Sequence, residues 1–210
     1  ENKTSLIVRT KPNVQSYHTH DDNLSIHFSH DNVDWISDMG HYPAKRAYFN
    51  SRIAHNCIVR NLANEQLTNT EFYTEQLNNK HYILSFSNNK FKHTREIIFY
   101  SSKHIVLKDK VENKEIEEHT RFNQLFHTGS NIKIKNKRDH SIDLICGNLK
   151  MSIIQKNKTS KLETFYGSEK PYLGWIAEDP SNIRKTYTLS FTSDIMQTVC
   201  YETEIIISKL

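Results

Sequence analysis

The stretch Thr186-Tyr187-Thr188-Leu189-Ser190-Phe191 alternates polar and apolar side chains along its whole length. Successive side chains of a β-strand point to opposite faces, so this period of two predicts a half-buried strand. The shorter run Ile132-Lys133-Ile134-Lys135 repeats the pattern. Both runs favour strand over helix, because a helix would bring apolar side chains back every three or four residues.

Short apolar runs of this kind recur along most of the chain, separated by turn-forming pairs such as Asn88-Asn89 and Asp179-Pro180. The further predicted strands are residues 6–9, 24–29, 35–38, 56–60, 82–87, 96–100, 104–108, 141–146, 151–155, 162–166 and 198–207. Only residues 64–77 favour a turn or two of helix. Because the chain has only five glycines, its turns are expected to rely on asparagine, which tolerates positive φ. About a dozen antiparallel strands predict an all-β fold, an antiparallel multi-stranded β-sandwich of two packed sheets, in one domain over residues 1–210.

The charge of the chain is nearly balanced, with 28 Lys and Arg against 24 Asp and Glu. Its basic residues do not interleave with aromatic ones in a nucleic-acid-binding pattern, so no nucleic-acid partner is indicated. No apolar run approaches the roughly 18 residues of a membrane-spanning helix, so no membrane span is expected. Cys57, Cys146 and Cys200 are odd in number and lack the spacing of a disulfide or metal-binding set, which predicts three buried thiols.

Histidines, carboxylates and tyrosines gather in three segments of the N-terminal quarter of the chain. The segments are Tyr17-His18-Thr19-His20-Asp21-Asp22, Ser37-Asp38-Met39-Gly40-His41-Tyr42 and Ser51-Arg52-Ile53-Ala54-His55-Asn56. They stand between predicted strands, where side chains of a site are commonly presented on connecting loops. This combination is typical of a metal site, an acid/base site, or both side by side.

The spacing of four of these residues is compatible with one metal site. His18 and His20 are two apart and lie on the same face if their segment is extended. The hairpin predicted between the second and third strands would return Asp38 toward His20, and His55 begins a later strand. Two imidazoles and one carboxylate with an open fourth position suit zinc. Chance proximity is the alternative, because the chain contains 12 histidines.

Three other side chains near this set have two interpretations each. Asp22 either accepts a hydrogen bond from one of the histidines or is a solvated turn carboxylate. Tyr42 and Tyr48 either reach the same site or anchor the core, as buried tyrosines often do. The spacing leaves these alternatives open.

Taken together, the three segments resemble the heparinase II/III-like family of polysaccharide lyases. The family pattern has an HxHxD element followed by Leu-Ser, an Asp-x-Gly turn with a tyrosine after it, and Ser/Thr-x-Ala-His-Asn. The matching residues are His18-Thr19-His20-Asp21-Asp22-Asn23-Leu24-Ser25, Asp38-Met39-Gly40-His41-Tyr42 and Ser51-Arg52-Ile53-Ala54-His55-Asn56. Looser similarity at Thr94-Arg95, Asp109, residues 122–127 and Gly174-Trp175 extends it over most of the chain. The sequence departs from the family at Met39, where Pro or Ser is common, and at Cys57, where Thr is common.

The resemblance implies the C-terminal β-sandwich module of a two-domain lyase, with an N-terminal α/α-toroid domain outside this chain. It implies that His20, Asp38 and His55 bind a zinc ion with a mainly structural role. His18 would be a catalytic-site histidine facing the substrate, and Tyr42, or else Tyr48, would be the tyrosine of that site. The expected reaction is β-elimination of a uronic-acid-containing glycan.

A lyase of this kind implies an acidic polysaccharide as substrate, the helical domain of the same protein as partner, and a periplasmic or extracellular location in a bacterium. The chain begins at Glu1 without a methionine, so it is interpreted as a processed chain or a fragment that is inactive alone. Two other functions are compatible with the sequence. One is a non-catalytic glycan-binding sandwich in capsule or exopolysaccharide assembly, and the other is a metal-dependent hydrolase with a catalytic zinc.

Overall fold

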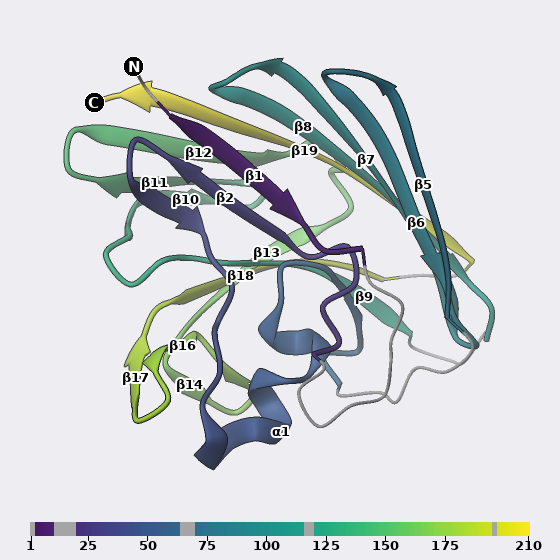
Figure 1. The fold of residues 1–210 in the computed structure, drawn as a ribbon, viewed down its shortest axis with the longest axis horizontal. Helices are drawn as coiled ribbons and strands as arrows, with labels where there is room; N and C mark the ends of the chain where they lie inside the picture. The colour runs from purple at the N-terminus through teal and green to yellow at the C-terminus, as the bar shows by residue number, and fades with distance from the viewer. Residues whose placement is uncertain (1–2, 11–19, 64–69, 116–119, 195–196) are drawn as a thin grey trace. The chain divides into compact units, whose positions relative to one another are not determined.

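The computed structural model describes residues 3–10, 20–63, 70–115, 120–194 and 197–210. These residues form strands β1 to β19 and three short helical turns, η1 (Pro43–Lys45), α1 (Arg46–Phe49) and η2 (Arg52–Ala54) (Figure 1). The predicted all-β class is therefore confirmed. A strand overlaps every run that the alternation of the sequence predicts.

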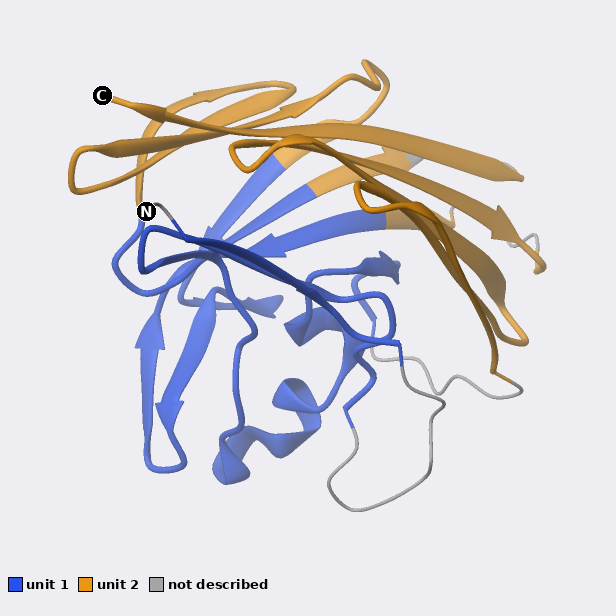
Figure 2. Ribbon diagram, turned by 45° about the horizontal axis from the view of Figure 1, so that its top comes forward, with its two compact units in different colours: residues 1–65, 123–132, 163–190 blue, residues 66–122, 133–162, 191–210 orange. Residues whose placement is uncertain are grey.

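The chain divides into two compact units, which are coloured separately in Figure 2. Unit 1 contains residues 1–65, 123–132 and 163–190, and unit 2 contains residues 66–122, 133–162 and 191–210. The unit boundaries fall within three strands, β9 (Arg121–His127), β13 (Lys161–Tyr166) and β18 (Tyr187–Asp194). Together with β4 (Ile58–Arg60), these strands form a four-stranded sheet in the order β13-β18-β9-β4.

Unit 2 is built on an eight-stranded sheet in which all neighbouring strands are antiparallel. In order across the sheet, the strands are β10 (Lys133–Arg138), β11 (Ser141–Cys146), β12 (Leu149–Gln155), β19 (Thr198–Lys209), β8 (His104–Asn113), β7 (Phe91–Ser101), β6 (His81–Ser87) and β5 (Glu71–Asn78). Buried and exposed side chains alternate along β19, as expected for a sheet with one covered face.

A buried ionic cluster lies on the covered face of this sheet. The Arg95 side chain on β7 donates to both carboxylate oxygens of Asp109 on β8, at 2.7 and 2.9 Å, and His93 Nε2 lies 2.7 Å from the same carboxylate. Burial alone would raise the pKa of Asp109, but the Arg95 guanidinium and His93 hold it well below its ordinary value. The charge of Asp109 is therefore retained inside the unit.

Unit 1 carries three small antiparallel sheets. They are β1 (Thr4–Val8), β2 (Ile26–His30) and β3 (Val33–Ile36); β14 (Ser168–Glu169) with β15 (Tyr172–Leu173); and β16 (Trp175–Asp179) with β17 (Asn182–Lys185). The β2–β3 hairpin turns at Asp31 and Asn32, which both have positive φ, of 51° and 62°. That pair of angles is typical of a type I′ hairpin turn, so a turn without glycine is confirmed here.

The structure corrects the expected burial of β18. The strand itself is as predicted, but the polar Thr188 and Ser190 are buried as well as the apolar Leu189. Their hydroxyls have partners on the neighbouring strand: Thr188 Oγ1 lies 2.8 Å from His127 Nδ1, and Ser190 donates to Asn123 at 3.2 Å. Satisfied hydroxyls make burial of both faces tolerable.

Two further expectations are wrong. Of residues 64–77, which favoured helix in the sequence, residues 64–69 lie outside the described residues, and the rest from Glu71 onward belongs to strand β5. Of the three cysteines expected to be buried, only Cys57 is; Cys146 is half-buried and Cys200 is exposed. In the described part of the chain, no helix is long and apolar enough to cross a membrane.

Candidate functional site

The β2–β3 hairpin brings two of the predicted ligand segments together. The two strands pair antiparallel, with Phe28 opposite Ile36 and His30 opposite Val33. The chain that enters β2 therefore lies beside the chain that leaves β3. Asp38 follows Ile36 by two residues, and His20, six residues before Ile26, lines the same cavity as Asp38. Opposite the hairpin, the Ser37 N–H donates to the carbonyl of His127 at 2.9 Å, which fixes the residue before Asp38.

The third segment is held to the first two by the buried side chain of Asn56. Its amide nitrogen donates to the carbonyls of Ile26 and Ser37, both at 2.8 Å, and its amide oxygen accepts from the His127 N–H at 2.6 Å. One side chain thereby ties together three separate strands or strand ends. The sequence places Asn56 in the third motif but gives no sign of this clamping role.

His55 precedes this clamp and ends the η2 turn, where its N–H donates to the carbonyl of Arg52 at 3.1 Å. Its Nδ1 lies 3.0 Å from Asp38 Oδ2, and its ring centroid lies 5.3 Å from that of His20. The structure thus brings His20, Asp38 and His55 into one cluster, as their motifs predict. His18, the fourth member of the set, lies outside the described residues.

The Asp38 carboxylate is stabilised in its charged form. Burial opposes the charge, but the hydrogen bond and charge of His55, the Gly40 N–H at 2.9 Å and the nearby His20 together keep the pKa of Asp38 well below its ordinary value. The pKa of His20 is lowered, chiefly by burial and by the neighbouring His55. A neutral imidazole beside a carboxylate is the form of a histidine that binds a metal.

The chemistry of this donor set fits zinc. Two atoms bound to one tetrahedral zinc at about 2.0–2.1 Å lie roughly 3.3 Å apart, close to the 3.0 Å between His55 Nδ1 and Asp38 Oδ2. The His55 Nε2 atom is buried and has no hydrogen-bond partner among the described residues. In those same residues, however, no three His, Cys, Asp or Glu side chains stand in a complete metal-binding arrangement. Zinc binding therefore stays a proposal.

A cavity of about 500 Å³ opens beside this cluster. Its lining includes His20 and Asp38 together with His41, whose ring centroid lies 6.0 Å from that of His20. Asp22 also lines it and accepts from the Arg9 side chain at 2.7 Å. Asp22 was expected either to accept a hydrogen bond from a histidine or to be a solvated turn carboxylate. Neither describes it fully, because its partner among the described residues is Arg9, which lines the same cavity.

The two candidate tyrosines lie in the adjoining apolar core rather than in that cavity, whose lining includes neither. Tyr48 is buried, and its ring packs edge-on against Phe49 and Tyr172, with centroids 5.0 and 4.8 Å apart. Burial raises the pKa of the Tyr48 phenol far above its ordinary value, and its hydroxyl has no partner among the described residues. Tyr42 packs against Phe49, with ring centroids 6.1 Å apart, and is half-buried.

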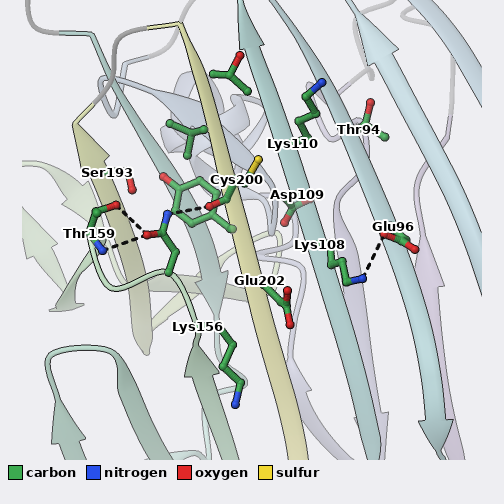
Figure 3. A pocket seen from close by; sticks show the side chains of 14 residues that line it. Thr94, Glu96, Lys108, Asp109, Lys110, Lys156, Thr159, Ser193, Cys200 and Glu202 are labelled. Atoms are coloured by element: carbon green, nitrogen blue, oxygen red, sulfur yellow. Dashed lines mark hydrogen bonds and ion pairs between the residues drawn. The ribbon is translucent and has the colours of Figure 1, made fainter.

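A second cavity, of about 770 Å³, lies within unit 2 over β7, β8 and β19 (Figure 3). Three lysines line it, and each has a carboxylate within ion-pair distance. The pairs are Lys108 with Glu96 at 3.8 Å, Lys110 with Glu112 at 2.6 Å and Lys156 with Glu204 at 2.9 Å. Balanced charges on exposed strands are typical of a solvated sheet face, so the candidate site is the cluster in unit 1.

A family model described as "Heparinase II/III-like, C-terminal" matches residues 1–186. The chain therefore belongs to this family, and the resemblance inferred from the three motifs is confirmed.

Solved structures of similar fold include a heparinase III, the BT4657 gene product, with a TM-score of 0.82, 18% identity and 98% of this chain covered. A heparan sulfate lyase, HepC from Pedobacter heparinus, matches with a TM-score of 0.81 and 13% identity over 99% of this chain. These matches confirm the antiparallel β-sandwich as the fold class. The chain spans about a third of each of these structures, 33% in both cases. No curated protein matches the chain significantly.

Proposed function

We infer that this chain is the β-sandwich module of a polysaccharide lyase that cleaves a uronic-acid-containing glycan by β-elimination. The observation that carries this proposal is the convergence of His20, Asp38 and His55 in a member of this family. The solved structures of similar fold are named as a heparinase and a heparan sulfate lyase. From those names we take a glycan as the proposed class of substrate.

Elimination on a uronic acid requires one base and one acid. The base removes the proton from C5, the electron pair of that C–H bond forms the C4–C5 double bond, and the bond from C4 to the glycosidic oxygen breaks. The acid gives a proton to the departing oxygen, so no water is consumed. Neutralisation of the substrate carboxylate makes the C5 proton easier to remove.

His18 and a tyrosine are the groups of this chain proposed for those proton transfers. Tyr42 is preferred to Tyr48 because it is only half-buried, whereas the Tyr48 hydroxyl is buried and its phenol is strongly held in the neutral form. A phenol that does not reach solvent or substrate cannot exchange a proton with a glycan. Tyr48 then acts as a packing residue beneath Tyr172.

A zinc ion held by His20, Asp38 and His55 would supply positive charge beside the Asp38 carboxylate and cross-link three segments of the chain. Asn56 aligns the segments, and the Gly40 N–H orients the Asp38 carboxylate. This role is structural, and the cleavage is assigned to His18 and Tyr42.

The remaining groups of the active site are proposed to come from an N-terminal helical domain of the same protein. This proposal is consistent with the chain spanning a third of the solved lyases. A location in the periplasm or outside a bacterial cell follows from the substrate class, because acidic polysaccharides of this kind are found there.

The test is an ultraviolet assay for the unsaturated product, run on a longer product of the same gene and on the 210-residue chain. A panel of heparin, heparan sulfate, hyaluronan and alginate covers the substrate class. We expect absorbance to rise with the longer protein on one of these glycans, and to be lost in its His18→Ala variant. Robust activity of the 210-residue chain alone would contradict the two-domain proposal.

One observation favours a non-catalytic glycan-binding module instead. Among the described residues, neither candidate tyrosine lines the cavity beside His20 and Asp38. A glycan that binds the longer protein tightly and is never cleaved would support this second function. Saturated cleavage products that disappear on chelation would indicate a metal-dependent hydrolase.

A further inference from the structure

Two aromatic side chains of unit 1 stack on each other. Tyr172 on β15 and Trp175 on β16 have ring centroids 5.7 Å apart and planes inclined by only 12°. The Trp175 indole N–H donates to the carbonyl of Ser168 at 3.0 Å, and Tyr48 packs edge-on against Tyr172. The stack is therefore fixed in position, and both of its rings remain partly exposed.

A lysine lies over each ring of this stack. Lys45 Nζ is 5.4 Å from the Tyr172 centroid, and Lys185 Nζ is 5.7 Å from the Trp175 centroid. Both lysines are exposed, and among the described residues neither lies within ion-pair distance of a carboxylate. They differ in this from the lysines of the unit 2 cavity. The four residues are called the cationic stack below.

The position of Lys185 depends on a glycine beneath it. A Cβ atom built on Gly167, which has a φ of +53°, would lie 2.5 Å from the Cγ and Cδ atoms of Lys185. The aliphatic part of the lysine thus lies directly on the backbone at residue 167. The Gly167 N–H is itself fixed by the carbonyl of Gly174 at 2.9 Å. The aliphatic part of Lys185 is therefore held in place before any ligand arrives, while the residue remains exposed.

The cationic stack adjoins the candidate site. The Ala177 N–H on β16 donates to the carbonyl of Met39 at 2.8 Å, and Met39 follows Asp38 directly. Gly40 permits this approach, because a Cβ there would lie 2.8 Å from the Ala177 carbonyl oxygen. Tyr172 and Trp175 pack on the same apolar core as Met39 and Tyr48. The stack and the Asp38 segment therefore share one support.

We propose that Lys45, Tyr172, Trp175 and Lys185 form a binding subsite for an acidic sugar unit of a glycan, with Lys45 and Lys185 pairing with its carboxylate or sulfate groups. An exposed cation–π contact contributes only about 0.5–1 kcal/mol, whereas hydrogen bonds to charged groups contribute about 1.5–3 kcal/mol. An anionic ligand can therefore draw each ammonium from its ring and leave an aromatic face for the sugar.

This inference rests on the proposed glycan substrate and adds the residues that recognise its charge. A purely structural role for the stack, as a brace for the β14–β15 and β16–β17 hairpins, is the competing explanation. The two explanations differ in what a change of charge does. A brace needs the rings, whereas a subsite needs the ammonium groups as well.

Binding of heparin, hyaluronan and alginate to the 210-residue chain is measured by isothermal titration calorimetry, with neutral dextran as reference. We compare wild type with the double variants K45Q/K185Q and K45R/K185R, and with Lys156→Gln as a matched control in unit 2. We expect one acidic glycan to bind and dextran not to bind. The glutamine pair is expected to weaken that binding by about tenfold or more, while the arginine pair and Lys156→Gln stay near wild type.

Equal binding by wild type and the glutamine pair overturns the subsite and supports the brace. Failure of every acidic glycan to bind wild type also overturns it. Binding that is lost in the glutamine pair, in a longer protein without lyase activity, supports the subsite and rejects only the proposed catalysis. Lyase activity with an unchanged KM in the glutamine pair rejects only the subsite.

Discussion

The Nδ1 atom of His55 lies 3.0 Å from the Oδ2 atom of Asp38, although the two residues are 17 positions apart in the chain. Neither residue belongs to a regular strand or helix. Their approach is produced by the β2–β3 hairpin on one side and by the Asn56 clamp on the other. Because the hairpin and Asn56 do not depend on the side chains of His55 and Asp38, the framework and the proposed ligands can be mutated and measured separately.

Asn56→Ala is expected to destabilise the protein strongly. The substitution removes a fully buried amide and leaves the carbonyls of Ile26 and Ser37 and the N–H of His127 without that partner. Unsatisfied buried polar groups cost about 1–3 kcal/mol each, so a loss of roughly 3 kcal/mol or more is expected. Urea unfolding measures this loss. Asn182→Ala, at an exposed turn, is the control, and an equal effect of both changes would refute the clamp.

Gly40→Ala tests the close approach of β16 to the Asp38 segment. Gly40 has a φ of +77°, and a Cβ there would lie 2.8 Å from the Ala177 carbonyl oxygen. Gly147 also has positive φ, 58°, but a Cβ there would meet nothing within 4 Å. Gly147→Ala should therefore cost only about 1 kcal/mol of backbone strain, and Gly40→Ala should cost more. Thermal unfolding of both variants gives the comparison, and equal melting temperatures would show that the approach is not tight.

Asp109 is expected to make the protein sensitive to acid. Its folded-state pKa is held well below the ordinary value, against the effect of burial, by Arg95 and His93. Its contribution to stability is therefore complete above the unfolded-state pKa of about 3.9, and it is lost as the pH falls from there toward the folded-state pKa. Unfolding free energy measured between pH 7 and pH 2 should begin to fall in wild type at about pH 4.

Asp109→Asn should lower the stability at pH 7, because the substitution removes the negative charge that the buried Arg95 guanidinium contacts through two hydrogen bonds. Removing one member of a buried ion pair costs about 3–5 kcal/mol. The variant should also lose less of its remaining stability on acidification than wild type. An acid-induced loss as large as that of wild type would assign the acid sensitivity to other carboxylates.

Asp38→Asn tests whether a bound zinc ion contributes to the stability of the fold. If a zinc ion bridges the three segments, the substitution and a chelator should each lower the melting temperature of the protein, and the chelator should have little further effect on the variant. Differential scanning calorimetry with and without EDTA measures this. Asp34→Asn is the control, since that carboxylate is exposed and lies beside His27. Unchanged melting temperatures in Asp38→Asn and in EDTA would reject a structural metal.

The hairpin that carries Asp38 was predictable from sequence because its strands bury apolar side chains on one face. Ile26 and Phe28 alternate with half-buried residues along β2, and this period specifies both the strand and its pairing. The turn at Asp31-Asn32 supplies the positive φ angles that the pairing needs without glycine. Asp38 then follows within two residues of β3.

Strand β5 was not predictable, because almost all of its residues are exposed. A strand without a buried face carries no alternation, and its conformation comes from pairing with β6. The β16–β17 hairpin was not predictable for a related reason, since its strands are short and none of their residues is buried. The cationic stack could not be found from sequence either, because Lys45 and Lys185 are brought to the rings only by the fold.

Within the site, the motif residues were recognisable but their supports were not. Asn56 appears in the sequence as an ordinary polar residue beside His55. Its hydrogen bonds to Ser25, Ile26, Ser37 and His127 join segments that are distant in the chain. Tyr48 matched a site tyrosine as well as Tyr42 did by position alone. Burial now separates them, because Tyr48 is 7% exposed and Tyr42 is half-buried.

The most direct test of the central claim is the zinc content of the purified chain, measured by elemental mass spectrometry in wild type, His20→Ala and His27→Ala. His27 lines the same cavity as His20 but is not one of the three proposed ligands. We expect zinc near one equivalent in wild type and in His27→Ala, and its loss in His20→Ala. Zinc that is absent from wild type after exposure to zinc salts, or retained in His20→Ala, would contradict the site.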